Sequence, residues 1–212
     1  MGEVTLPGHS GRATHAMVFM LSGISTRWKQ TVAYYFTGNS VYGSALMPII
    51  VNIITKAWEI GLRVLTVTSD MAACNRTMWS TFGICCGKMM KTVNRIPHPC
   101  SSQYELFFLA DSPHLIKNLK AALVNGQDIT LPNWVIKEHN LCSNTVTANH
   151  LRALLTFQGS LQLKLSPGLT TKTLTPSHFD KMKVSNAMSF FSHSNAAGLE
   201  YLVRAHNHSN SS

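Results

Sequence analysis

The stretch Arg63–Ser69, RVLTVTS, is a short β-branched run that ends directly before Asp70. A run of this length and character, bounded by polar residues, is typical of a buried strand. The stretch Tyr104–Ala110, YELFFLA, has the same character and ends directly before Asp111, and a helical pattern follows each aspartate. Because a crossover through a helix makes neighbouring strands parallel, the two stretches predict parallel strands of an α/β sheet.

The segments on either side extend this α/β pattern. Upstream, Ala16–Leu21 and Thr31–Thr37 are short apolar and aromatic runs, and their spacing predicts a hairpin. Apolar residues then recur at helical spacing over Ser44–Ile60, which predicts an amphipathic helix that ends at Gly61. The helices expected after the two aspartates cover Met71–Phe82 and Ser112–Val124.

The composition changes near Asn125, where strand patterns give way to helical ones. We therefore expect an α/β domain over 1–124, a mostly helical domain over 125–205 and a disordered Ser/Asn-rich tail over 206–212. The helices expected in the second domain cover Leu131–Leu141, Thr147–Phe157 and Phe179–His206.

Composition also narrows the class of protein. Hydrophobic residues make up 45% of the 212, which excludes wholesale disorder, and the net charge of +9 favours a polyanionic partner such as nucleic acid or nucleotide phosphates. Gly, Pro and Asn interrupt the longest uncharged stretch, and the N-terminus has no apolar signal-peptide core. We therefore expect an intracellular protein with no membrane contact. The five cysteines are odd in number and form no C-x-x-C pair, which favours reduced thiols.

Asp70 and Asp111 are the first candidates for functional residues. Ligands of open α/β sheets bind at the carboxyl ends of the strands, where both aspartates are expected. One interpretation is structural, because an Asp at this position caps the first turn of the following helix. The other is that both carboxylates hold Mg²⁺, a hard cation that prefers oxygen ligands and supports phosphodiester chemistry.

The segment 111–118, DSPHLIKN, contains a second pattern of interest. A helix N-terminus together with Lys117 could face phosphate, although Lys117 could equally serve as a solvated surface residue. A P-loop is excluded, because the stretch 83–88, GICCGK, has too few residues between its glycines. Zinc is disfavoured because the thiols and imidazole involved lack paired spacing, so free thiols are the alternative. That set is Cys85, Cys86, His98 and Cys100.

Basic side chains could line a nucleic-acid channel through phosphate contacts, and solvated helix faces explain them equally well. These residues are Lys88, Lys91, Arg95, Lys117, Lys120, Lys164, Lys172, Lys181 and Lys183.

Four separated stretches, in the same order, resemble the P-element transposases and their THAP-domain relatives. The resemblance covers nearly the whole chain. The stretches are Met17–Phe36 (MVFMLSGISTRWKQTVAYYF), Val64–Ile84 (VLTVTSDMAACNRTMWSTFGI), Asp111–Leu123 (DSPHLIKNLKAAL) and Leu174–Leu202 (LTPSHFDKMKVSNAMSFFSHSNAAGLEYL).

The resemblance implies a partial RNase H-like mixed sheet followed by a mostly helical GTP-binding insertion domain. In that family, the residue matched by Asp70 is a catalytic, Mg²⁺-binding aspartate. The residues matched by Asp111 and Lys117 serve the guanine nucleotide and its Mg²⁺. The nearest matches to a second nucleotide-contacting pair are Phe179 and Asp180, and Lys183 stands where the family has an amide.

The resemblance also implies what the matched segment lacks. The family's first catalytic aspartate lies on a central strand ahead of this segment, and its terminal catalytic acid lies beyond it. We therefore expect a catalytically incomplete fragment of a DNA transposase, with an unpaired strand edge inside its sheet. DNA ends as partner, a nuclear location and homo-oligomers of the full-length protein are further implications. A non-catalytic nucleotide- or DNA-binding module and an inert mobile-element remnant remain as alternatives.

Overall fold

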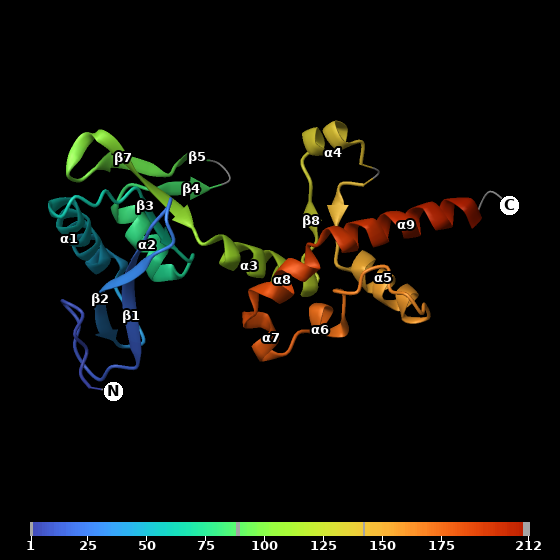
Figure 1. Ribbon diagram of the computed structural model, residues 1–212, viewed down its shortest axis with the longest axis horizontal. Helices are drawn as coiled ribbons and strands as arrows, with labels where there is room; N and C mark the ends of the chain where they lie inside the picture. The colour runs from blue at the N-terminus through green and yellow to red at the C-terminus, as the bar shows by residue number, and fades with distance from the viewer. Residues whose placement is uncertain (1, 88–89, 142, 210–212) are drawn as a thin grey trace. The chain divides into compact units, whose positions relative to one another are not determined.

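The computed structural model describes residues 2–87, 90–141 and 143–209, with the side chains of 206–209 left aside. The chain forms two compact units, 1–111 and 112–212, each with its own hydrophobic core (Figure 1). The first is an α/β unit and the second is mostly helical, as the sequence predicts.

The predicted hairpin is present in the first unit. Strand β1 (His15–Ser22) pairs antiparallel with β2 (Lys29–Thr37), and the register shifts between Phe19 and Met20. Alternate residues of β1 are half-buried, because one face of the hairpin covers the core and the other faces solvent.

Helix α1 (Leu46–Glu59) follows a short 3₁₀ turn, η1 (Gly43–Ala45), and supplies much of the first core. Its apolar positions recur on one side, so Leu46, Ile50 and Ile54 are all buried. The helix ends before Gly61, whose φ of +80° lies in the left-handed region that glycine adopts without strain. The predicted helix and its end are thus confirmed.

The two stretches with the terminal aspartates form parallel strands, as predicted. Strand β3 (Thr66–Ser69) pairs with β7 (Ser101–Ala110), and Ser69 lies opposite Ala110. Helix α2 (Ala73–Thr81) makes the crossover from β3. Strand β3 is shorter than the predicted stretch Arg63–Ser69, because only the second half of that stretch pairs with β7.

Three strands occur where the sequence indicated only an irregular connection. Strand β6 (Arg95–His98) adds antiparallel to β7 and completes a sheet of order β3-β7-β6. Its Pro97 lowered its strand propensity, but proline is tolerated in an edge strand. Strands β4 (Cys85–Gly87) and β5 (Met90–Val93) form a separate ribbon.

Within the described residues, the hairpin and the three-stranded sheet share no strand pairing. A cavity of about 350 Å³ separates them, lined by Met17–Leu21 of β1 and by Thr66–Asp70 on the other side. The edges of β1 and β3 that face this cavity have no partner strand in the described chain. This arrangement agrees with the unpaired edge expected inside the sheet.

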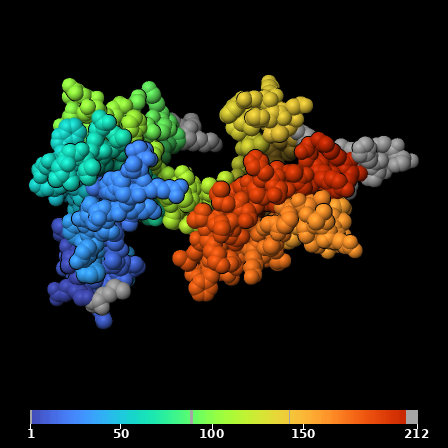
Figure 2. All heavy atoms as spheres, viewed as in Figure 1, coloured from blue at the N-terminus to red at the C-terminus, as the bar shows by residue number. Residues whose placement is uncertain are grey.

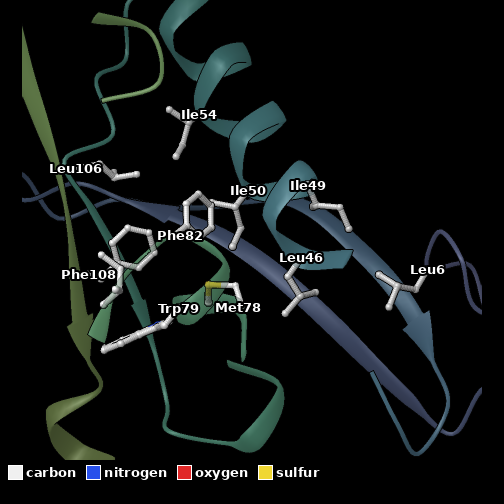
Figure 3. Packing of buried hydrophobic residues seen from close by; sticks show 11 residues of the cluster. Leu6, Leu46, Ile49, Ile50, Ile54, Met78, Trp79, Phe82, Leu106 and Phe108 are labelled. Atoms are coloured by element: carbon white, nitrogen blue, oxygen red, sulfur yellow. The ribbon is translucent and has the colours of Figure 1, made fainter. Parts of the chain in front are cut away.

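Aromatic and aliphatic side chains from several elements fill the first core (Figure 3). The rings of Phe82 and Phe108 lie tilted to each other with 5.0 Å between their centroids, and Trp79 meets Phe108 edge-on at 6.1 Å. Met78 reaches toward Leu46 from α2 (Figure 3). Removing these rings from water supplies much of the stability of this unit, because buried aromatics contribute the largest apolar areas.

The second unit begins with the predicted helix α3 (Ser112–Val124), which packs against α8 (Val184–Phe190) and α7 (His178–Met182) and so belongs with the later helices. The division of the chain therefore falls at Asp111, ahead of α3, whereas the composition change placed it near Asn125. The hydrophobic core of the second unit contains Leu123, Leu151, Leu154 and Phe190. The helices are α3 (Ser112–Val124), α4 (Asn133–His139), α5 (Asn149–Gly159), α6 (Thr171–Leu174), α7 (His178–Met182), α8 (Val184–Phe190) and α9 (His193–Ser209).

Several sequence predictions for this unit differ from the structure. Strands do not stop at Asn125, because β8 (Ile129–Thr130) and β9 (Thr145–Val146) form a short ribbon. This ribbon carries α4, and the segment projects from the body of the unit (Figure 2). Three separate helices, α7, α8 and α9, occupy the region where one long helix over Phe179–His206 was expected. The last of these extends to Ser209, so residues 206–209 are helical, and 210–212 lie outside the described residues.

Candidate functional site

Asp70 follows β3 directly and lies half-buried at the carboxyl end of that strand. Its Oδ1 accepts hydrogen bonds from Ala72 N–H at 2.9 Å and from Asn75 Nδ2 at 2.8 Å. Trp79 of α2 donates from Nε1 to Ser69 Oγ at 3.1 Å, which ties the helix to the end of the strand. The capping role considered from the sequence is not present, because the N-cap of α2 is Ala72 and no side chain caps its first turn; the Asp70 carboxylate instead holds the residues between β3 and α2 together.

The two hydrogen bonds to Asp70 predict a stability effect. Replacing Asp70 with alanine removes the acceptor for two donors, so we expect the free energy of unfolding to fall by about 1 kcal/mol. Asp70→Asn keeps an acceptor oxygen at the same place and should stay close to the wild type. Urea denaturation followed by circular dichroism measures both, and equal losses in the two variants would contradict a stabilising role for the acceptor oxygen of Asp70.

Asp111 lies at the same edge of the sheet. Its backbone N–H donates to Ser69 C=O at 2.8 Å, and it follows the strand position paired with Ser69. The topology therefore brings Asp70 and Asp111 to neighbouring strand ends, as expected. Among the described residues, however, no three His, Cys, Asp or Glu side chains come together as a metal site. Two-metal chemistry needs several carboxylates, so this donor set does not fit a pair of Mg²⁺ ions.

A basic pocket of about 380 Å³ lies in the second unit. Five cationic side chains line it, from α3, α5, the end of α7 and the junction before α8, together with the polar Asn125 and Thr175. None of its described lining residues is acidic. We call this the basic pocket, and its cationic residues are Lys117, Lys120, Arg152, Lys181 and Lys183.

Lys120 is the most deeply placed of these residues. It is only 5% exposed, and its Nζ donates to Asn186 C=O at 3.4 Å. Burial lowers the pKa of Lys120 below its ordinary range, and the Asp180 carboxylate partly opposes that shift. A buried ammonium is costly unless it is paired, so this side chain would be stabilised by an anion in the pocket.

Other contacts orient two further cations. Arg152 donates to Asn149 Oδ1 and to Val124 C=O, each at 2.9 Å, which fixes the guanidinium between α5 and the end of α3. Lys117 lies one turn before Lys120 on α3, so both side chains project from the same face of the helix. A pocket built this way attracts phosphate groups, because cationic donors converge on it from several elements.

The second predicted nucleotide pair does not line the pocket. Phe179 is 76% exposed, and its ring packs edge-on against His178. Asp180 accepts hydrogen bonds from Ser177 Oγ at 2.7 Å and Ser177 N–H at 3.4 Å in a capping box. The bond from Ser177 Oγ lowers the pKa of Asp180, and the nearby Lys183 adds to the effect. Of the predicted cofactor residues, only Lys117 therefore lines the basic pocket, while Asp111 ends the first unit.

The thiols considered for zinc are free in the structure. Cys86 is exposed, and Cys85 and Cys100 are partly buried. Lys88 and Cys142 lie outside the described residues.

Sequence reasoning placed Lys120 and Lys181 only among the basic residues and missed Arg152, whose position on α5 had no signal for a site. In the described part of the chain, no helix is long and apolar enough to span a membrane.

Comparison with known proteins relates the chain to DNA transposases. Residues 2–83 match the family model "TNP-like, RNase H N-terminal domain". The human DNA transposase THAP9 is 29% identical over 192 residues, which cover 90% of this chain and 20% of that protein. The Drosophila melanogaster transposable element P transposase is 25% identical over 122 residues, covering 55% of this chain and 15% of that protein.

A solved structure shares the fold. The Drosophila P element transposase strand transfer complex matches with a TM-score of 0.73 at 20% sequence identity, over 91% of this chain and 39% of that chain. The chain thus spans about a fifth or less of the two curated relatives. An RNase H-like fold for the first unit agrees with both the family model and this match.

Proposed function

Because this chain is related to the P-element transposases, we propose that it is a transposase segment that binds a nucleotide in the basic pocket and does not cleave DNA with its own described residues. GTP is the nucleotide that the family resemblance implies. The observation that carries the proposal is the convergence of five cations, one of them buried, on a pocket with no acidic lining residue in the described chain. The phosphates of GTP fit this pocket by charge, with Lys117 and Lys120 on one face of α3 to hold them.

DNA is a second proposed partner. The relatives are DNA transposases, and the chain carries a net charge of +9. A basic protein gains affinity for DNA through release of counterions from phosphates, without reading the base sequence. We therefore propose that the segment acts on DNA in the nucleus as part of a transposase assembly, with binding that weakens steeply as salt is added.

Calorimetry with GTP tests nucleotide binding. We expect saturable heat for the wild-type chain and an affinity lower by about tenfold for Lys117→Ala, because a charge-assisted hydrogen bond contributes about 1.5–3 kcal/mol. Lys172→Met is the matched control, since Lys172 is exposed on α6 and lies outside the basic pocket. A folded wild-type chain that gives no heat with GTP would favour the alternative of an inert remnant.

A strand-transfer assay tests the proposal that the chain has no catalytic activity on DNA. Asp70 belongs to no group of three or more His, Cys, Asp or Glu side chains within the described residues, so we expect no joining of a DNA end to a target in the presence of Mg²⁺. Electrophoresis of a labelled DNA end detects joined product. Joining that disappears in Asp70→Asn would show that the donor set described here suffices for catalysis.

A further inference from the structure

We propose that the basic pocket recognises its ligand through the phosphate groups and does not distinguish guanine from adenine. This inference rests on the proposed function and concerns the specificity of the same pocket. It departs from the guanine preference that the family resemblance implies.

The first supporting observation concerns Asp180. Guanine presents N–H donors at N1 and at its 2-amino group, and a carboxylate can accept both because it has only acceptor oxygens. In this chain the Asp180 carboxylate accepts from Ser177 N–H and Oγ, and Lys183 Nζ lies 3.5 Å from its Oδ1. Ser177 and Lys183 therefore engage the carboxylate that the resemblance pairs with the nucleotide, and Asp180 does not line the basic pocket.

The second supporting observation concerns the neutral polar groups of the lining, Asn125 and Thr175. An Asn amide carries donors and an acceptor, and a Thr hydroxyl is both donor and acceptor. Such groups can pair with the edge of adenine as readily as with that of guanine. The exposed ring of Phe179 adds no preference, because stacking on an aromatic ring tolerates every base.

The cationic side chains of the basic pocket determine most of its affinity. Lys117, Lys120 and Arg152 are all partly or fully buried, so an anion in the pocket meets cations that water screens incompletely. Lys181 and Lys183 add charge at the exposed side. Most of the binding free energy therefore comes from the phosphates, which are identical in GTP and ATP.

The test compares GTP, ATP, inorganic tripolyphosphate and guanosine by calorimetry with the full chain. We expect GTP and ATP to bind within about threefold of each other, tripolyphosphate within about tenfold of GTP, and guanosine to give no saturable heat. Lys181→Gln should weaken all three anions by the same factor, while Lys172→Met should leave them unchanged. Circular dichroism confirms that each variant is folded.

Other results would contradict either the inference or the proposed function. Binding of GTP more than about thirtyfold tighter than ATP would overturn the inference and leave the proposed nucleotide binding intact. Failure of every phosphate ligand to bind the folded chain would overturn the proposed function itself. Phosphate could also come from a DNA backbone. Displacement of bound GTP by a short random-sequence duplex, at equal phosphate concentration, would assign the pocket to DNA and overturn the proposed nucleotide binding, while recognition through phosphate would stand.

Discussion

Lys120→Met should raise the stability of the chain at neutral pH and weaken GTP binding by about tenfold to a hundredfold, because a hydrogen bond from a charged group contributes about 1.5–3 kcal/mol. The methionine has nearly the same length but carries no charge. It therefore removes the cost of burying the ammonium and also removes the most deeply buried cation of the basic pocket. A residue that costs stability and supports binding is typical of a ligand site.

The pH dependence follows from the lowered pKa of Lys120. Between its folded-state pKa and the ordinary value of 10.5, the unfolded chain binds more protons than the folded chain. The contribution of Lys120 to the free energy of unfolding therefore rises with pH across that window, and the full cost of the buried charge is present below it. The charged groups that face Lys120 are Lys117 on α3, Arg152 on α5, and Asp180, Lys181 and Lys183 around α7.

Thermal denaturation and GTP calorimetry on the same samples measure both effects. The wild-type chain should gain stability relative to Lys120→Met as the pH is raised through the window, because its lysine becomes neutral there. Lys172→Met is again the control and should change neither quantity. A Lys120→Met variant that is less stable than the wild type at neutral pH, yet binds GTP normally, would place Lys120 in the fold rather than in the site.

Gly43→Ala should unfold the first unit or lower its free energy of unfolding by about 3 kcal/mol, the upper end of the usual cost of overpacking. A Cβ at Gly43 would overlap the carbonyl oxygen of Cys74 and would lie 2.7 Å from Met78 N. Both atoms belong to the backbone of α2, which cannot rotate away as a flexible side chain could. The close approach of η1 to α2 thus requires glycine at this position.

Gly38→Ala is the matched control, because the only neighbour of its added Cβ is a Val4 methyl group at 4.0 Å. Near-ultraviolet circular dichroism follows the loss of packing around Trp79 in the first core. Since the basic pocket lies in the second unit with a separate core, GTP binding should survive Gly43→Ala better than this signal does. Wild-type stability of Gly43→Ala would contradict the close packing of η1 on α2.

The local patterns of the sequence predicted much of the first unit. Helical spacing over Ser44–Ile60 and the β-branched stretch before Asp70 depend on residues near one another in the chain. Both patterns can therefore be recognised without the tertiary structure. The parallel pairing of β3 and β7 followed from the crossover through α2. The resemblance placed the chain among the transposases, which the comparisons support.

Only the tertiary structure decided which basic residues form a site. Lys117 and Lys120 share a helix face that the sequence could indicate, but Arg152 and Lys181 come from helices distant in the chain. The burial of Lys120 likewise depends on packing between elements, whereas the contacts of Asp180 with Ser177 and Lys183 are local, each three residues away in the chain. A sequence determines periodicity and charge along the chain, whereas the convergence of charges and their loss of solvent arise only when separate helices pack together.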